Sequence, residues 1–296
     1  MLNPRVLIPF ILSSLIWGST WLVITGQLGQ VPPVWSVAYR FLIGAAIMFV
    51  YALAIGATIR LDRRGHGFAL LFGIPQFCLN FIAVYQAERF ITSGLVAVVY
   101  ALLILPNSLF AWLFLKHRIT RPFLLGSIVA IGGIALLFLQ EFRANPSAAV
   151  LTGVALTLCG TLSAAIANNV QATQGIRAYP LPTMLAWGMT YGAAANALIA
   201  LVVYGGPVFD TRITYWAGLA YLGVVASALV FSLYFPLVRT IGPAKAAYTS
   251  LVIPVIAMLL STIFEGYAWT PMALGGGLLV FAGLFIALRT SRAEPS

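Results

Sequence analysis

The chain has 296 residues, of which 61% are hydrophobic and only 7% are charged, and its formal net charge is +10. Because an ordinary soluble domain carries about 25% charged residues, this composition excludes a water-soluble globular protein. The positive charge does not indicate a nucleic-acid partner, since the basic residues are spread over short loops and do not form one solvated basic face.

Apolar stretches of about 20 residues follow one another along the chain, and a helix of that length crosses the hydrocarbon core of a bilayer. The apolar run over residues 97–114 lacks the alternation that builds a membrane β-barrel. The first stretch has no small-residue cleavage site, so it is interpreted as a retained helix and not as a signal peptide. The sequence predicts an all-α, polytopic protein with ten transmembrane helices, at roughly residues 5–25, 34–56, 67–87, 93–115, 122–140, 148–174, 182–204, 214–237, 243–263 and 270–289.

The Lys and Arg residues predict the orientation of the spans, because cytoplasmic loops retain the excess of basic residues. With both termini in the cytoplasm, the outer loops hold only Arg89, Arg143 and Arg212, and Arg40 falls inside the second span. The cytoplasmic side then holds Arg5, Arg60, Arg63, Arg64, Lys116, Arg118, Arg121, Arg177, Arg239, Lys245, Arg289 and Arg292. We expect a multi-pass protein of the bacterial inner (cytoplasmic) membrane with cytoplasmic N- and C-termini.

The second half of the chain repeats features of the first half. The segment Tyr100-Ala-Leu-Leu-Ile-Leu-Pro106 recurs as Tyr248-Thr-Ser-Leu-Val-Ile-Pro254. Because five spans per repeat is an odd number, the second repeat must enter the membrane from the opposite side. The sequence therefore predicts two inverted five-helix repeats, one over residues 1–145 and one over residues 146–296. Such repeats are typical of secondary transporters, whose substrate site lies near the membrane midplane.

The motifs of the first repeat resemble those of a known transporter family. They are Ala87-Glu88-Arg89-Phe90-Ile91-Thr92-Ser93-Gly94, Pro106, Lys116-His117-Arg118-Ile119 and a helix with Gly132-Gly133. This pattern resembles the repeat of the drug/metabolite transporter superfamily, in its ten-helix branch of two EamA-type units, and within it the YddG-type exporters of aromatic and other amino acids. The acid common after the fourth helix of such units is replaced by Lys116-His117, whereas Glu265 keeps it in the second repeat. The resemblance implies a transporter that exports neutral or aromatic amino acids or related metabolites by alternating access.

Polar and aromatic side chains near the middle of the spans are the candidates for a substrate cavity, because polar groups that face lipid are costly. We expect the cavity to be lined by Trp17, Tyr39, Arg40, Gln76, Asn80, Tyr100, Ser163, Trp187, Tyr191, Tyr248 and Ser250. At similar depth lie Asn107, Asn168, Asn169 and Asn196. These residues are too many for one cavity.

Arg40 is the basic residue that lies well inside a span, roughly 9 Å from the span's outer end at 1.5 Å per residue. One interpretation is that it binds the carboxylate of an amino acid, since no Asp or Glu lies mid-span to neutralise it. The other is that it extends to the outer headgroups or to helix-end carbonyls. Tyr100 and Tyr248 can likewise either stack on a substrate or serve ordinary packing.

Three prolines are candidate hinges: Pro75, Pro106 and Pro254. A mid-span proline removes one intrahelical hydrogen bond, so the helix can bend during transport or simply carry a fixed kink. Small residues on two matching helices, among them Gly126, Ala130 and Gly133 in the first repeat and Gly275–Gly277 with Gly283 in the second, indicate close helix packing.

The absence of certain groups narrows the function. His66 and His117 lie in loops and the acids lie at span ends, so the sequence predicts no dedicated carboxylate proton relay, no metal site and no cofactor, which leaves downhill export or exchange. The chain lacks an ATP-binding P-loop and a converging nucleophile and base, which argues against a pump driven by ATP and against an intramembrane enzyme. A channel needs a ring of repeated polar groups, usually from several subunits. We expect a carrier, working as a monomer on a small molecule; the alternative is a multidrug exporter of amphipathic compounds.

Overall fold

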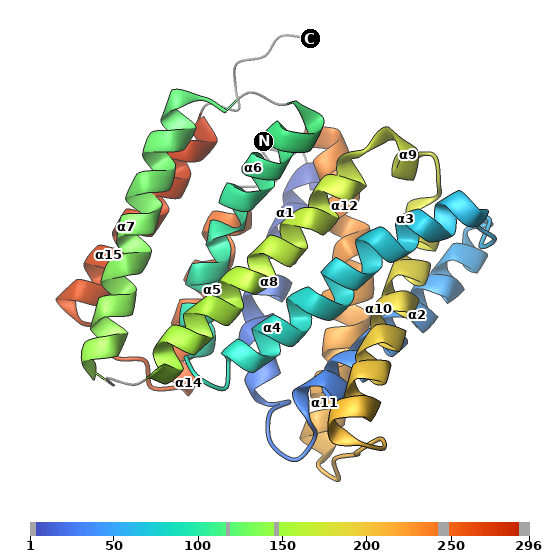
Figure 1. Cartoon of the computed structure of the whole chain (residues 1–296), viewed down its shortest axis with the longest axis horizontal. Helices are drawn as coiled ribbons and strands as arrows, with labels where there is room; N and C mark the ends of the chain where they lie inside the picture. The colour runs from blue at the N-terminus through green and yellow to red at the C-terminus, as the bar shows by residue number, and fades with distance from the viewer. Residues whose placement is uncertain (1–3, 117–118, 145–147, 242–248, 290–296) are drawn as a thin grey trace.

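The computed structural model describes residues 4–116, 119–144, 148–241 and 249–289, and these residues form helices joined by short connections, with no strand among them (Figure 1). The helices are α1 (Pro4–Thr25), α2 (Pro33–Ala54), α3 (Arg63–Ile74), α4 (Asn80–Ala87), α5 (Ser93–Tyr100), α6 (Ile104–Leu115), α7 (Arg121–Ala144), α8 (Ala148–Ala172), α9 (Gln174–Arg177), α10 (Leu181–Tyr204), α11 (Ile213–Ala220), α12 (Val230–Ile241), α14 (Thr249–Phe264) and α15 (Pro271–Arg289).

Eight continuous helical segments are long and apolar enough to cross a membrane: Pro4–Thr25, Pro33–Ala54, Arg63–Ala87, Ser93–Phe114, Arg121–Gln140, Ala148–Ala172, Leu181–Tyr204 and Ile213–Tyr234. Two shorter apolar helices, Val252–Phe264 and Pro271–Ala287, follow them. The prediction of an all-α membrane protein with ten spans is confirmed. The first residues of the predicted span 243–263 lie outside the described residues.

Three of the spans are not uniform α-helices. The third span contains a π-helical segment, η1 (Pro75–Leu79), where the Asn80 N–H donates to the Pro75 carbonyl five residues back. The eighth span contains a second π-helical segment, η3 (Tyr221–Leu229). The fourth span passes through a 3₁₀ turn, η2 (Ala101–Leu103), just before Pro106, which has no N–H to donate to the preceding turn. Such breaks are frequent at functional sites.

The first helix of each half of the chain packs against helices of the other half. Helix α1 packs against α12 and α14, and its counterpart α8 packs against α4, α5 and α6. Helix α2 packs against α10, and α7 packs against α15. Helix α1 descends from the end of the bundle where the chain starts, whereas α8 ascends toward that end (Figure 1). We call this the N-terminal end; the opposite end carries the α4–α5 and α14–α15 connections. Both this packing and the reversed direction fit an inverted pair.

The α7–α15 pair is a close backbone contact between small residues. A Cβ atom on Gly133 would lie 2.6 Å from the Gly276 carbonyl oxygen and 2.6 Å from the Val280 nitrogen. Gly126 faces the Gly283 carbonyl oxygen and Ala287 in the same way. Real Cβ atoms do not approach backbone so closely, which confirms the packing interpretation for Gly126, Gly133, Gly276 and Gly283. It is wrong for Gly275 and Gly277, because a Cβ atom at either position would have no neighbour within 4 Å.

Replacing Gly133 with leucine is expected to lower the melting temperature of the detergent-solubilised protein. The added side chain must push α7 away from α15, and overpacking of this kind costs about 1–3 kcal/mol. The adjacent Gly132 is a matched control, because a Cβ atom there has no neighbour within 4 Å. If Gly132→Leu and Gly133→Leu gave the same melting temperature, the close contact would be disproved.

Candidate functional site

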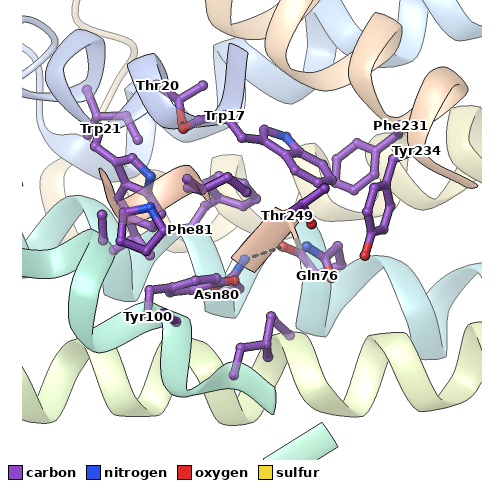
Figure 2. Close-up of a pocket in the computed structure, with 18 of the residues that line it drawn as sticks. Trp17, Thr20, Trp21, Gln76, Asn80, Phe81, Tyr100, Phe231, Tyr234 and Thr249 are labelled. Atoms are coloured by element: carbon purple, nitrogen blue, oxygen red, sulfur yellow. Dashed lines mark hydrogen bonds between the residues drawn. The ribbon is translucent and has the colours of Figure 1, made fainter. Parts of the chain in front are cut away.

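A pocket lies in the middle of the bundle and is lined by both halves of the chain (Figure 2). Its volume is about 150 Å³, well above the roughly 10–15 Å³ that one water needs. The lining side chains come from α1, α2, the third, fourth and eighth spans, α8 and α14: Trp17, Thr20, Trp21, Ile24, Arg40, Gln76, Asn80, Phe81, Val84, Ala97, Tyr100, Ala101, Leu103, Ala164, Asn168, Phe231, Tyr234, Thr249, Ile253 and Pro254.

Helical spacing explains how single helices supply several of these side chains. Trp17, Trp21 and Ile24 are four and three residues apart on α1, so they lie on one helix face. Gln76 belongs to η1 and Asn80 begins α4, where the π turn sets the direction of the side chains that follow.

Polar groups on one wall of the pocket bind one another. The Tyr100 hydroxyl donates to the Asn80 Oδ1 atom at 2.9 Å, and the Asn80 Nδ2 atom donates to the Gln76 carbonyl oxygen at 3.4 Å (Figure 2). Both polar atoms of the Asn80 amide thus form hydrogen bonds, and the bond to the hydroxyl fixes the ring of Tyr100 against the third span. Tyr100 also packs against Trp21, with ring centroids 5.2 Å apart.

Aromatic rings form the opposite wall. Trp17 contacts Phe231 and Tyr234, with ring centroids 5.5 and 4.9 Å apart (Figure 2). Its indole Nε1 donates to the Ala226 carbonyl oxygen of η3 at 3.3 Å. The π-helical segment of the eighth span therefore helps to hold Trp17 at the pocket.

Arg40 lies in the interior of the protein. Its side chain is 1% exposed, and its Nε donates to the Ser227 Oγ atom of η3 at 3.1 Å. The guanidinium carbon lies 4.4 Å from the centroid of the Phe81 ring, a cation–π distance. This geometry does not fit a side chain that extends to the headgroups.

Three polar atoms of pocket-lining residues have no hydrogen-bond partner within the described part of the chain. They are the Arg40 Nη1 and Trp21 Nε1 atoms, which are donors, and the Gln76 Oε1 atom, which is an acceptor. Unpaired buried polar groups are costly and rare in native proteins. Water or another polar group that enters the cavity can form hydrogen bonds with these three atoms.

The structure brings five of the predicted cavity residues together at the pocket, together with one candidate hinge, Pro254: they are Trp17, Arg40, Gln76, Asn80 and Tyr100. Tyr248 lies outside the described residues, and Ser250 is described only as a backbone position of α14. Whether the pocket residues contact substrate stays a prediction.

The other predicted cavity residues lie outside this pocket. The Tyr39 hydroxyl donates to the Val208 carbonyl oxygen at 3.1 Å, although Tyr39 is next to Arg40 in the sequence. Adjacent helix residues point about 100° apart, so Tyr39 faces another neighbour. The Ser163 hydroxyl donates to the Cys159 carbonyl oxygen of its own helix at 3.0 Å.

Trp187 and Tyr191 lie one turn apart on α10 and surround a histidine instead of the pocket. The Tyr191 hydroxyl and the His66 Nδ1 atom are 2.8 Å apart, and the His66 ring meets the Trp187 ring edge-on at 4.8 Å. The Trp187 Nε1 atom donates to the Ile59 carbonyl oxygen at 2.9 Å. These contacts attach α10 to the start of the third span. Among the candidate hinges, Pro75 opens η1 and Pro106 lies in α6, away from the pocket lining.

Sequence reasoning missed several lining residues, namely Thr20, Trp21, Phe81, Phe231, Tyr234 and Thr249. Trp21 follows Trp17 by four residues, and Phe81 directly follows Asn80. A search along the helix face of each candidate would have found Trp21. Phe231 and Tyr234 have no such sequence signal, because only packing of the eighth span brings them to Trp17.

Glu88 directly follows α4, at the end of the third span, and its side chain is only 6% exposed. Burial raises the pKa of the Glu88 carboxyl well above its ordinary value, the neighbouring Glu265 raises it further, and Arg40 lowers it. A buried acid therefore lies within electrostatic reach of Arg40. Within the described residues, no three His, Cys, Asp or Glu side chains lie together as a metal site would require.

The sequence matches a known protein family over most of its length. The family described as EamA-like transporter family matches residues 5–139 and again residues 151–289. The "Probable amino-acid metabolite efflux pump" of Salmonella typhimurium is 28% identical over 92% of this chain and 90% of its own length. "Protein PagO" of the same organism is 24% identical over 97% of this chain and 94% of its own length.

Two further similarities also extend over most of the chain. The "Uncharacterized inner membrane transporter YedA" of Escherichia coli is 26% identical over 93% of this chain and 88% of its own length. A solved crystal structure superposes with a TM-score of 0.70 at 19% identity, covering 97% of this chain and 96% of the other chain. The last similarity concerns the fold alone.

Proposed function

The chain belongs to the EamA-like transporter family and is a multi-pass membrane transporter; from this premise we propose that it exports neutral, often aromatic, amino acids or related small metabolites. The relative named as an amino-acid metabolite efflux pump supports this substrate class. The proposed mechanism is secondary transport by alternating access, without catalysis of a chemical reaction.

The three unpaired pocket atoms carry the proposal. An amino acid presents a carboxylate, which accepts hydrogen bonds, and an ammonium group, which donates them. Arg40 Nη1 and Trp21 Nε1 are free donors for the carboxylate, and Gln76 Oε1 is a free acceptor for the ammonium group. The pocket therefore supplies the hydrogen-bond partners that a zwitterion loses when it leaves water.

The aromatic walls of the pocket supply the second half of the recognition. Trp17, Tyr100 and Phe231 present ring faces and edges that suit an apolar or aromatic side chain. The lining also contains small residues, Ala97, Ala101 and Ala164, which leave room for side chains of different size. Such a lining favours a range of neutral amino acids over a single one.

The proposed transport cycle uses the two repeats, which we place at residues 1–145 and 146–296, rocking about the central pocket. Pro75 and Pro106 lie at or near irregular helical turns, and Pro254 lines the pocket, so these prolines are the proposed hinges. We further propose that the protein works as a monomer in the bacterial inner membrane with both termini in the cytoplasm, so that the opposite end of the bundle faces outward. The inner-membrane relative supports this location.

Purified protein in liposomes tests the proposal directly. Labelled phenylalanine, threonine or methionine is expected to exchange across the membrane in a saturable manner, whereas empty liposomes retain it. If none of the three moved while cationic dyes did, the multidrug alternative would replace the amino-acid proposal. The buried cation Arg40 argues against that alternative, because like charges repel a cationic drug.

A further inference from the structure

Glu88 presents a carboxylate that the structure buries without a partner. It follows the last residue of α4, its backbone N–H donates to the Val84 carbonyl oxygen at 3.1 Å, and its side chain is 6% exposed. Neither carboxyl oxygen has a hydrogen-bond partner within the described residues. A buried ionised carboxylate in this state is strongly disfavoured, so such a group takes up a proton instead.

The neighbours of Glu88 come from both halves of the chain. Glu265, which follows α14, acts on Glu88 as a like charge and accepts hydrogen bonds from the Ser93 N–H at 3.3 Å and the Ser93 hydroxyl at 2.6 Å. Arg40 of α2 acts on Glu88 as an opposite charge, and Tyr85 of α4 lies within the electrostatic range of both. Helix α8, which also packs against α4, carries no charged side chain.

Arg40 therefore belongs to two sites at once. On one side it lines the pocket, where its Nη1 atom is free for a carboxylate. On the other side its positive charge favours the ionised form of Glu88. When a substrate carboxylate binds Arg40, it screens that charge from Glu88, and Glu88 then holds its proton more tightly. By linkage, protonation of Glu88 strengthens carboxylate binding by the same factor.

We propose that Glu88 is a proton-binding site coupled through Arg40 to the pocket, so that a carboxylate-bearing substrate binds together with a proton. The proton comes from water and forms an O–H bond with a Glu88 carboxyl oxygen. The coupling rests on the proposed function, since it requires the substrate carboxylate to bind Arg40; the proton site itself does not.

The proton site is tested without substrate, by melting temperature against pH. The raised pKa means that the folded protein binds more protons than the unfolded chain between the ordinary carboxyl pKa, about 4.3, and the raised value. The free energy of unfolding of the wild type therefore falls as pH rises through that window and levels off above it. Glu88→Gln is expected to remove this fall. Identical profiles for the two proteins above pH 5 would overturn the proton site.

Asp62→Asn is the matched control for this measurement. Gly65 N–H and the Tyr179 hydroxyl donate to Asp62 and lower its pKa. The stabilisation by ionised Asp62 is present above the ordinary carboxyl pKa and is lost as pH falls through the lowered value. Asp62→Asn is therefore expected to keep the wild-type profile above pH 5.

The coupling is tested by calorimetric titration with L-phenylalanine in two buffers of different ionisation enthalpy. The wild type is expected to take up as much as about one proton per bound phenylalanine, and its affinity to rise by up to about tenfold per unit of falling pH. Glu88→Gln is expected to take up none and to bind with an affinity that does not change with pH. A wild type that binds without proton uptake, or a variant that takes up as much, would contradict the coupling.

The two experiments separate the two proposals. If L-phenylalanine does not bind the wild type at any pH and no labelled amino acid moves in liposomes, the proposed function and the coupling both fail. The melting profile of Glu88→Gln still decides whether Glu88 binds a proton.

Discussion

Replacing Arg40 with leucine is expected to abolish transport of phenylalanine in liposomes and to make transport of phenethylamine, a cation without a carboxylate that Arg40 repels, faster than in the wild type. Removing one partner of a buried charged hydrogen bond costs about 2–5 kcal/mol, which corresponds to at least about 30-fold in affinity. The side chain is 1% exposed and has a free Nη1 atom at the pocket, so no other described cation can replace it there.

The phenethylamine measurement also distinguishes a local effect from misfolding, because a misfolded protein would transport neither compound. Arg63→Leu is the matched control, since Arg63 is an exposed arginine at the start of α3 and should leave both activities unchanged. Retained phenylalanine transport in Arg40→Leu would reduce Arg40 to a packing residue that binds Ser227 and Phe81.

Replacing Gln76 with leucine is expected to weaken phenylalanine and phenethylamine alike, by about 10- to 100-fold. The reason is that Gln76 Oε1 is the free acceptor at the pocket, and a hydrogen bond to a charged group contributes about 1.5–3 kcal/mol. Leucine keeps most of the side-chain volume but cannot accept from an ammonium group. Equilibrium binding of the two ligands to purified variants measures the effect.

3-Phenylpropionate, which lacks the ammonium group, provides the opposite test. Its binding should be nearly unaffected by Gln76→Leu and lost in Arg40→Leu. The two variants should therefore differ in which of the two ligands they still bind. Gln174→Leu, at an exposed glutamine of α9, is the control. If Gln76→Leu weakened 3-phenylpropionate as much as phenethylamine, Gln76 would act through the shape of the pocket and not through the ammonium group.

The sequence predicted the fold well because membrane insertion is governed by local hydropathy. Each span is a run of apolar residues, and its position can be read without knowledge of its neighbours. The repeat of Tyr100 to Pro106 as Tyr248 to Pro254 indicated two related halves, and the family model matches the chain twice, at residues 5–139 and 151–289; the bounds of the two repeats stay a prediction. The irregular turns were not predicted, because the same apolar composition suits α, π and 3₁₀ backbones.

The sequence predicted how deep in the membrane the pocket residues lie, but not which neighbour each side chain faces. Gln76, Asn80 and Tyr100 were found because polar groups near mid-span must face other protein groups or water. The same argument also selected Tyr39 and Trp187, which turned out to bind the carbonyl oxygens of Val208 and Ile59. Depth follows from residue number, whereas the side that a residue faces depends on which helix packs there.

The sequence by itself thus determined a membrane protein of ten helices with polar residues in their middle, since hydropathy and loop charges fix which segments enter a bilayer and in which direction. Only the tertiary structure decided which side chains meet. It placed Trp21 and Phe231 at the pocket, and it buried Glu88 within electrostatic reach of Arg40, although Glu88 is next to a charged residue at a span end. These contacts join residues far apart in the chain, and packing between helices creates them.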